Sequence, residues 1–201
     1  MKRILYLSVA LAALSAAPAI AGDAGQGGWY IGLNAGGTAG EFKTVATAVS
    51  PTKWGGNVSG GAQLGYEWPA GGSGYVYGVE ADITAIDVRA RASFAKFDED
   101  WSSTVRARLG MIYGDCTPFV SLGVGFTDFK QTLVGFGSNS SVRTGIAAGV
   151  GADLARGDKW TWRVEYLYVD VPKKLSHITG VPFDGGSGNH TVRIAFNYPL
   201  D

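Results

Sequence analysis

Eight stretches of this 201-residue chain alternate apolar and polar residues with a period of two, the pattern of β-strands that have one apolar face. Most of these stretches reach about ten residues, which is the length that a tilted strand needs to cross an outer membrane. The pattern therefore predicts an all-β fold, an eight-stranded antiparallel up-and-down transmembrane β-barrel. The predicted strands are 29–38, 54–67, 75–84, 101–113, 119–128, 141–154, 160–169 and 190–198.

The connections between the predicted strands alternate in length. Short periplasmic turns and longer outer loops are typical of outer-membrane barrels, and an even strand count puts both termini on the periplasmic side. Serine, asparagine and glycine at 138–141 and 185–188 mark two loop tips. The short connections are predicted at 67–74, 114–118 and 155–159, and the long ones at 39–53, 85–100, 129–140 and 170–189.

Alternation alone also fits a soluble, lipocalin-like barrel whose apolar face lines a ligand cavity. The polar face favours the membrane alternative, because it combines small residues with charges of both signs and has no lysine in mid-strand. The apolar residues are also too many for the narrow interior of an eight-stranded barrel, whereas lipid can accept them all. They are Ile31, Leu33, Leu64, Val79, Ile83, Val105, Leu109, Val120, Leu122, Val124, Ile146, Val150, Val164, Val192 and Ile194.

Aromatic residues gather at the ends of the predicted strands. Amphipathic rings at both ends form the interfacial girdles of a membrane barrel, because such rings lie at headgroup level. The predicted periplasmic girdle contains Trp29, Tyr66, Trp68, Tyr75, Tyr77, Tyr113, Trp160, Trp162 and Tyr198; Trp54, Trp101, Phe126, Phe129 and Tyr168 lie near the opposite ends.

The N-terminus predicts export. Lys2 and Arg3 precede an apolar run over 4–17, and Ala19-Ile20-Ala21 offers a small-x-small cleavage site, so residues 1–21 are expected to be a cleaved signal peptide and 22–201 the barrel domain. The alternative is a retained membrane anchor. Cleavage would leave 15 basic and 17 acidic residues, a balance that gives no electrostatic case for nucleic-acid binding. The single cysteine, Cys116, excludes an intrachain disulfide.

The polar face of the predicted barrel carries paired charges. Buried charges must be paired, arginine binds carboxylates bidentately, and eight strands leave little open lumen. A structural salt-bridge network is therefore favoured over a gated ion path or a catalytic acid pair. Its predicted members are Glu80, Asp82, Asp153 and Glu165 with Arg106, Arg108, Arg163 and Arg193; Glu67 lies at the periplasmic end.

Seven short motifs follow one another along the whole mature chain. They are Gly28-Trp29-Tyr30-Ile31-Gly32, Gly78-Val79-Glu80-Ala81-Asp82, Val105-Arg106-Ala107-Arg108-Leu109-Gly110, Pro118-Phe119-Val120, Gly145-Ile146-Ala147-Ala148-Gly149-Val150-Gly151, Glu165-Tyr166-Leu167-Tyr168 and Val192-Arg193-Ile194-Ala195-Phe196-Asn197-Tyr198. In this order they resemble the opacity-like porin and outer-membrane immunogenic protein family, which is related to the OmpA transmembrane domain. The resemblance implies a surface antigen of an alphaproteobacterial outer membrane. Members of that family end on an aromatic residue that the barrel-assembly machinery reads, whereas the nearest aromatic residue here is Tyr198, followed by Pro199, Leu200 and Asp201.

The two histidines provide weak candidate chemistry. A serine hydrolase needs a histidine base beside a serine, and His177 follows Ser176 while His190 lies near Ser187. Neither pair has the His-x-Ser spacing of the lipid A deacylases. Hemin binding, said of some relatives in the resembled family, would rest on the same two histidines, although their spacing matches no metal site.

We therefore expect a non-enzymatic outer-membrane protein that supports envelope integrity and displays surface loops. A narrow or gated pore is the first alternative, and a lipid A-modifying enzyme is the second. No catalytic residue, metal or cofactor is expected. The expected partners are outer-membrane lipid and lipopolysaccharide, the barrel-assembly machinery, and a host or environmental ligand at the surface loops.

Overall fold

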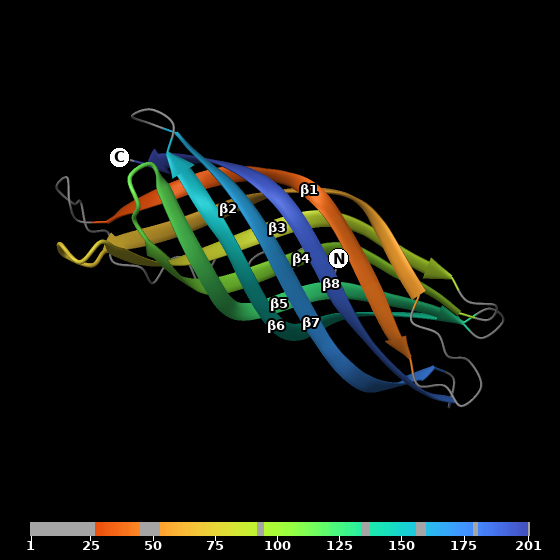
Figure 1. Cartoon of the computed structure of the whole chain (residues 1–201). Coiled ribbons are helices and arrows are strands. Elements are labelled where there is room, and N and C mark those ends of the chain that lie inside the picture. Colours follow the sequence, from red (N-terminus) through yellow and green to blue (C-terminus); the bar gives the residue numbers. More distant parts are fainter. Residues whose placement is uncertain are drawn as a thin grey trace.

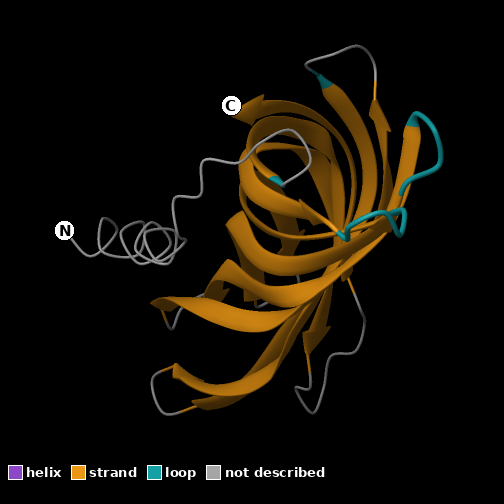
Figure 2. Cartoon of the chain, turned by 90° about the vertical axis from the view of Figure 1, so that its left-hand side faces the viewer, coloured by secondary structure: helices purple, strands orange, loops and turns teal. Residues whose placement is uncertain are grey.

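A computed structural model describes residues 27–44, 53–91, 95–133, 137–155, 160–178 and 181–200. The described residues form a closed barrel of eight antiparallel strands in sequence order, and β1 pairs with β8 to close it. Figure 1 shows the tilted strands from the side, and Figure 2 shows them winding around a ring. The strands are β1 (Gly28–Thr44), β2 (Lys53–Pro69), β3 (Tyr75–Arg91), β4 (Ala95–Met111), β5 (Cys116–Leu133), β6 (Gly137–Ala155), β7 (Thr161–Ile178) and β8 (Val181–Leu200).

Tight turns join strands at the end where β1 begins and β8 ends. Trp29 pairs with Leu200 at this end, and the β4–β5 turn closes through the Cys116 amide, which donates to the Tyr113 carbonyl at 3.0 Å. Gly114 in this turn has a φ of 55°, a left-handed conformation that glycine adopts without steric cost. Short turns lie on the periplasmic side of outer-membrane barrels, so this end faces the periplasm and the opposite end faces the outside of the cell.

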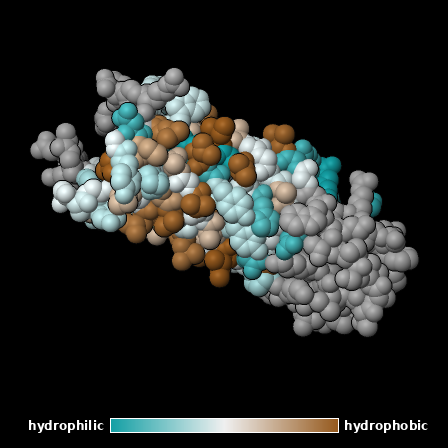
Figure 3. All heavy atoms as spheres, in the orientation of Figure 1, coloured by the Kyte–Doolittle hydropathy of each residue, from teal (hydrophilic) through white to brown (hydrophobic). Residues whose placement is uncertain are grey.

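The outer face of the barrel is apolar and its inner face is polar. Of the fifteen apolar residues predicted to face lipid, fourteen are more than 40% exposed, and Leu64 is half-buried. In the space-filling view, brown apolar side chains gather in a band across the visible face of the molecule (Figure 3). The prediction that the apolar face of the barrel points to lipid is therefore confirmed, since a soluble barrel would bury these side chains in its interior.

The strands are longer than predicted, because they continue past the bilayer on the extracellular side. Each has 17–20 residues, whereas crossing the membrane takes about 9–11. The predicted long loops 85–100, 129–140 and 170–189 and the two loop tips at 138–141 and 185–188 lie largely within strands, so those predictions are wrong. Of the predicted loop 39–53, residues 39–44 and 53 belong to strands, and 45–52 lie outside the described residues. Outside the bilayer the outer face of a strand need not be apolar, so the alternation of apolar and polar residues no longer marks the strand. Lys130 accordingly lies in β5 rather than in a loop.

Charged side chains appear on the outer face of the barrel at the level where the strands leave the bilayer. Outward-facing charges begin at Asp87 and Arg89 on β3 and at Asp128 and Lys130 on β5. The segments on the periplasmic side of this level carry the apolar band and span the membrane. None of the described residues belongs to a helix long and apolar enough to cross a membrane.

Candidate functional site

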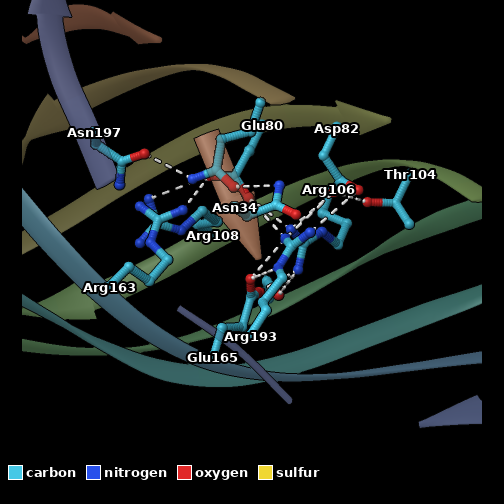
Figure 4. Close-up of polar contacts among 12 residues, drawn as sticks. Asn34, Glu80, Asp82, Thr104, Arg106, Arg108, Arg163, Glu165, Arg193 and Asn197 are labelled. Atoms are coloured by element: carbon cyan, nitrogen blue, oxygen red, sulfur yellow. Dashed lines mark hydrogen bonds and ion pairs between the residues drawn. The ribbon is translucent and has the colours of Figure 1, made fainter. Parts of the chain in front are cut away.

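The lumen within the membrane-spanning part is filled by charged side chains from five strands. All eight predicted members of the lumen network point inward, and none exposes more than 9% of its surface. Glu80 and Asp82 lie on β3, Arg106 and Arg108 on β4, Asp153 on β6, Arg163 and Glu165 on β7, and Arg193 on β8. Figure 4 shows most of them converging on one region of the lumen.

Glu80 is the centre of the lumen network. It lies directly opposite Arg106 in the β3–β4 ladder and accepts a hydrogen bond from the Arg106 guanidinium at 2.6 Å. From the far wall, Arg163 on β7 donates to its other oxygen. The Tyr30 hydroxyl donates to that same oxygen, Oε2, at 2.5 Å. One carboxylate therefore joins strands β1, β3, β4 and β7 across the lumen.

A second group of ion pairs lies toward the extracellular side of Glu80. Glu165 pairs with Arg106, accepts a hydrogen bond from Arg193 Nε at 2.8 Å, and lies 2.7 Å from Arg193 Nη2 in an ion pair. Asp82 lies 3.1 Å from Arg106 and 3.3 Å from Arg193, and the Thr104 hydroxyl donates to it at 2.5 Å. Arg106 thus binds three carboxylates, while its burial leaves only 1% of its surface exposed.

A third group of ion pairs closes the periplasmic end of the lumen network. Asp153 accepts from Arg163 Nε at 2.5 Å and from Arg108 at 2.7 Å. Arg108 also pairs with Glu67, which is partly exposed, and its guanidinium lies 4.0 Å from the centre of the Phe119 ring. With Glu67 included, five carboxylates face four arginines in the lumen network, and each of these four guanidiniums has a carboxylate partner.

Glycine on the lumen face makes room for the large side chains. A Cβ atom at Gly149 would lie 2.9 Å from Glu165 Oε1 and 3.1 Å from Arg106 Nη1. At Gly65, a Cβ atom would lie 2.3 Å from the Tyr30 ring. Glycine at these two positions therefore leaves room for the Tyr30 ring and for the Glu165–Arg106 pair.

Several lumen residues were not predicted. Tyr30 bonds both Glu80 and Arg108, and an amide chain runs from Asn34 through Gln63 to Asn197. The alternation of β1 could have shown that Tyr30 and Asn34 share the lumen face. The partners of Tyr30 could not have been found in this way, because Glu80 and Arg108 lie on β3 and β4, which do not neighbour β1.

An apolar septum lies above the lumen network. Ala147, Leu167, Val169 and Val171 form a buried cluster there. A methyl group of Val169 lies 2.6 Å from the place that a Cβ of Gly125 on β5 would occupy, and Val88 fills the corresponding space beside Gly40 on β1. Branched side chains from β3 and β7 therefore reach past one intervening strand, β2 or β6, and pack against glycines of β1 and β5.

At the level of Val88 and Val169, and outside the membrane-spanning part, Glu99 joins opposite walls of the barrel. It is fully buried on β4, and the Asn189 amide on β8 donates to it at 2.5 Å. Burial raises the pKa of the Glu99 carboxyl, against the opposing effect of hydrogen bonds from Ser187 and Asn189 and of the charge of Arg143. Arg143 in turn lies over the Phe129 ring, 4.2 Å from its centre.

The candidate serine and histidine pairs are not assembled among the described side chains. His190 lies on the outer face, where its Nδ1 is 2.6 Å from the Tyr166 hydroxyl and its ring is 4.7 Å from the ring of Tyr168. Ser187 faces the lumen and is fully buried, so β8 separates it from His190. The side chains of Ser176 and His177 lie outside the described part. Among the described residues, no group of three or more His, Cys, Asp or Glu could hold a metal ion.

The aromatic residues of the predicted periplasmic girdle lie on the outer face near the tight turns. Tyr66 is 7% exposed because Trp29 and Trp68 cover it, with ring centres 5.1 and 4.5 Å away. The Trp160 ring lies 4.8 Å from the Tyr198 ring. The remaining members are Tyr75, Tyr77, Tyr113 and Trp162, all more than 40% exposed.

The aromatic residues expected at the opposite ends are less uniform. Trp101 and Tyr168 are half-buried within β4 and β7, and the side chain of Trp54 lies outside the described part. Phe129 is 1% exposed and faces the lumen, so its expected place at the interface is wrong. It shares odd numbering with the lumen-facing residues of β5, and its place near a strand end was a misleading signal.

An apolar exterior, a charged interior and a sheet without an edge inside the bilayer define an integral outer-membrane β-barrel protein, because hydrocarbon tolerates no unpaired backbone. The chain belongs to the family described as outer membrane protein beta-barrel domain, whose model matches residues 7–198. Its place is therefore the outer membrane.

Named relatives agree with this family. The chain is 30% identical to the 31 kDa outer-membrane immunogenic protein of Brucella melitensis, over 85% of this chain and 82% of that protein. It is 28% identical to the 22 kDa outer membrane protein of Rhizobium leguminosarum, over 65% and 60%. Among solved structures, Ail of Yersinia pestis aligns with a TM-score of 0.48 at 17% identity, covering 84% of this chain and 98% of Ail.

Proposed function

We propose that this protein is a non-enzymatic, structural protein of the outer membrane. It supports envelope integrity and displays its extracellular strand ends and loops at the cell surface. The observation that carries the proposal is the filled lumen. Arg106 and Glu80 belong to a buried ionic layer, and Val169 and Val88 belong to an apolar layer above it. A barrel filled in this way offers its outer wall and its extracellular end for function.

Deleting the gene tests the proposed role in the envelope. The deletion strain is expected to become sensitive to SDS and to large antibiotics such as vancomycin, and a plasmid copy of the gene is expected to restore resistance. An unrelated eight-stranded barrel expressed at the same level is the control for membrane crowding. Unchanged resistance in the deletion strain would contradict the role in envelope integrity.

A narrow pore is the first competing function, and the two layers of the lumen argue against it. Conduction would require ions to pass buried ion pairs such as Arg106–Glu165 and then the apolar septum around Leu167. In planar bilayers we expect no discrete channels, and in liposomes no swelling with small sugars. Steady channels from protein with the heat-sensitive gel mobility of a folded barrel would favour the pore.

A lipid A-modifying enzyme is the second competing function. His190 and Ser187 lie on opposite faces of β8, so they cannot act as a base and nucleophile pair. Mass spectrometry of lipid A should give identical profiles for the wild-type and deletion strains. Hemin binding is tested with a His177→Ala, His190→Ala double variant, and binding that requires both histidines would revive that function.

Two further expectations belong to this proposal. Residues 1–21, which lie outside the described residues, act as a signal peptide that is removed to leave the barrel domain 22–201. N-terminal sequencing of the protein from purified outer membranes should begin at Gly22. The partners would be lipopolysaccharide around the apolar band, the barrel-assembly machinery during insertion, and external ligands at the surface.

A further inference from the structure

The barrel opens into two sheets on the extracellular side. The β2–β3 ladder ends at the pair Gly60 and Ala85, and the β6–β7 ladder ends at Ile146 and Asp170. The six other ladders continue toward the strand tips, as in β5–β6, which reaches Leu133 and Gly137. Figure 1 shows the blue ends of β7 and β8 diverging from the green and teal ends of β5 and β6. Above the membrane the strands therefore form two four-stranded sheets, β7-β8-β1-β2 and β3-β4-β5-β6.

Irregular pairing at one level explains the separation. The register shifts between Ala85 and Val88 in β3–β4, between Glu99 and Ser102 in β4–β5, and between Val171 and Lys174 in β7–β8. A bulge bends its strand and increases its twist. These shifts fall where the β2–β3 and β6–β7 ladders end, so they turn β3 and β7 away from their neighbours.

The opened edges lie in water. Lipid-exposed open sheet edges do not occur in the hydrocarbon region, because unpaired backbone groups there are too costly. The outer faces at this level carry Asp87, Arg89 and Asp128, and Ser140 donates to Asp128 at 3.0 Å. The four edges are therefore above the bilayer, within reach of molecules outside the cell.

Three of the four edges carry features that oppose further strand pairing. Native edge strands are protected by charged residues and by proline, which cannot donate a hydrogen bond. Residues 171–178 of β7 include Pro172 followed by two lysines, and residues 86–91 of β3 include Asp87, Arg89 and Arg91. The edge of β2 begins with Lys53, and Asn57 donates across the gap to Asp87 at 3.0 Å.

The β6 edge at residues 137–142 has none of these protections. Its sequence, Gly-Ser-Asn-Ser-Ser-Val, contains no proline and no charge. Its other side pairs with β5 without a register shift, so the edge is a regular, extended template. Ser138, Ser140 and Val142 are exposed, and these small side chains leave the backbone accessible.

The geometry points to a strand-addition site: we propose that residues 137–142 of β6 bind an extended segment of a polypeptide outside the cell. In this binding mode main-chain hydrogen bonds give affinity and alternate side chains give specificity. The inference rests on the proposed display function and names its binding element. An incoming strand antiparallel to β6 would continue the sheet β3-β4-β5-β6 into the gap beside β7.

A second copy in the same membrane is a poor occupant. Every copy directs β6 from the extracellular end toward the periplasm, so two β6 edges related by rotation about the membrane normal would run parallel. Antiparallel pairing would need the β3 or β7 edge of the neighbour, and those edges carry Arg89 and Pro172. A polypeptide that is free to orient itself meets neither restriction.

The test selects peptides and locates where they bind. A phage-displayed library of random dodecapeptides is selected against the full-length mature protein in nanodiscs that hold one copy each, with empty nanodiscs as counter-selection. Amide hydrogen exchange of the protein is then followed by NMR with and without a selected peptide. At a peptide concentration of about ten times its Kd, exchange at the edge-facing amides of 137–142 should slow about tenfold.

Proline substitution provides the matched control. Successive residues of a strand direct their amides to opposite sides, so Asn139→Pro and Ser140→Pro remove one edge-facing amide and one amide bonded to β5. The variant that lacks the edge-facing amide should keep the heat-sensitive gel mobility of the folded barrel and bind peptide at least about tenfold more weakly. The other variant should loosen the β5–β6 ladder instead.

Three results would overturn the strand-addition site. They are the absence of any surviving clone, protection confined to loops or to other edges, and full binding by both proline variants. Slow exchange of 137–142 without peptide, seen only in nanodiscs with two copies, would assign the edge to a second copy instead. None of these results bears on antibiotic resistance of the deletion strain, so the envelope role would stand or fall separately.

Discussion

Replacing Arg106 with methionine would remove the guanidinium that joins three buried carboxylates while keeping an unbranched side chain in its place. Arg106 bonds Glu80 at 2.6 Å and Asp82 at 3.1 Å, and it also pairs with Glu165. Each carboxylate would keep other partners, but the charge at the centre of the lumen would no longer be balanced. Removing one partner of a buried ion pair typically costs about 3–5 kcal/mol, and we expect a loss of that size in the free energy of unfolding.

Arg89→Met is the matched control, because it makes the same chemical change outside the bilayer. Arg89 pairs with Asp87 at 2.6 Å, but its side chain is 57% exposed. Exposed ion pairs contribute about 0–1 kcal/mol, so this variant should stay within about 1 kcal/mol of the wild type.

Urea unfolding of both variants in phosphatidylcholine vesicles, followed by tryptophan fluorescence, measures the two losses. Reversibility is checked by superimposing the folding and unfolding curves. If Arg106→Met and Arg89→Met lowered the free energy of unfolding by the same small amount, the lumen network would contribute nothing to stability. The structural role proposed for it would then be wrong.

Other predictions test the close approach of strands, the buried acid outside the bilayer and closure of the barrel. A Cβ at Gly123 would lie 2.0 Å from the Val105 carbonyl, whereas one at Gly37 would meet nothing within 4 Å; Gly123→Ala should therefore cost at least about 1 kcal/mol in unfolding free energy, and Gly37→Ala should be nearly neutral in the same urea titration. Because burial raises the pKa of Glu99, this carboxyl is most compatible with folding below its unfolded pKa of about 4.3, and its favourable contribution is lost as pH rises through the folded pKa. Glu99→Gln should match the wild type near pH 4 and become relatively more stable as the pH rises, and a constant difference in unfolding free energy across this range would refute the assignment. Unboiled protein should migrate differently from boiled protein in SDS gels, and identical mobility would exclude a closed barrel.

Alternation along the strands was enough to predict the barrel and the inward direction of its charges. Glu80 and Arg106 could be placed side by side because they lie on consecutive strands at matching positions. The contacts that cross the lumen could not be predicted. Whether Tyr30 or Arg163 reaches Glu80 depends on the tilt and stagger of the whole barrel, which closure fixes globally.

The extracellular half of the strands was predicted poorly for a different reason. Lipid imposes an apolar outer face only within the bilayer, so Lys130 and Ser140 gave no strand signal although they pair with each other. The register shifts near Val88 and Val171 were also invisible, because a bulge changes which residues face inward without requiring a characteristic residue. The separation into two sheets follows from these shifts and was not expected.

The inward-facing arginines also affect which pairing register a strand can adopt. A slip by one residue turns every side chain of a strand to the opposite face, so a shifted β4 would direct Arg106 and Arg108 into the lipid. Each arginine near the bilayer midplane costs about 2–4 kcal/mol, and the two together would penalise the shifted strand by about 4–8 kcal/mol. The aliphatic outer face alone gives no such discrimination at glycine and alanine positions. A one-residue slip of β4 is therefore opposed by the cost of placing Arg106 and Arg108 in lipid instead of in the lumen network.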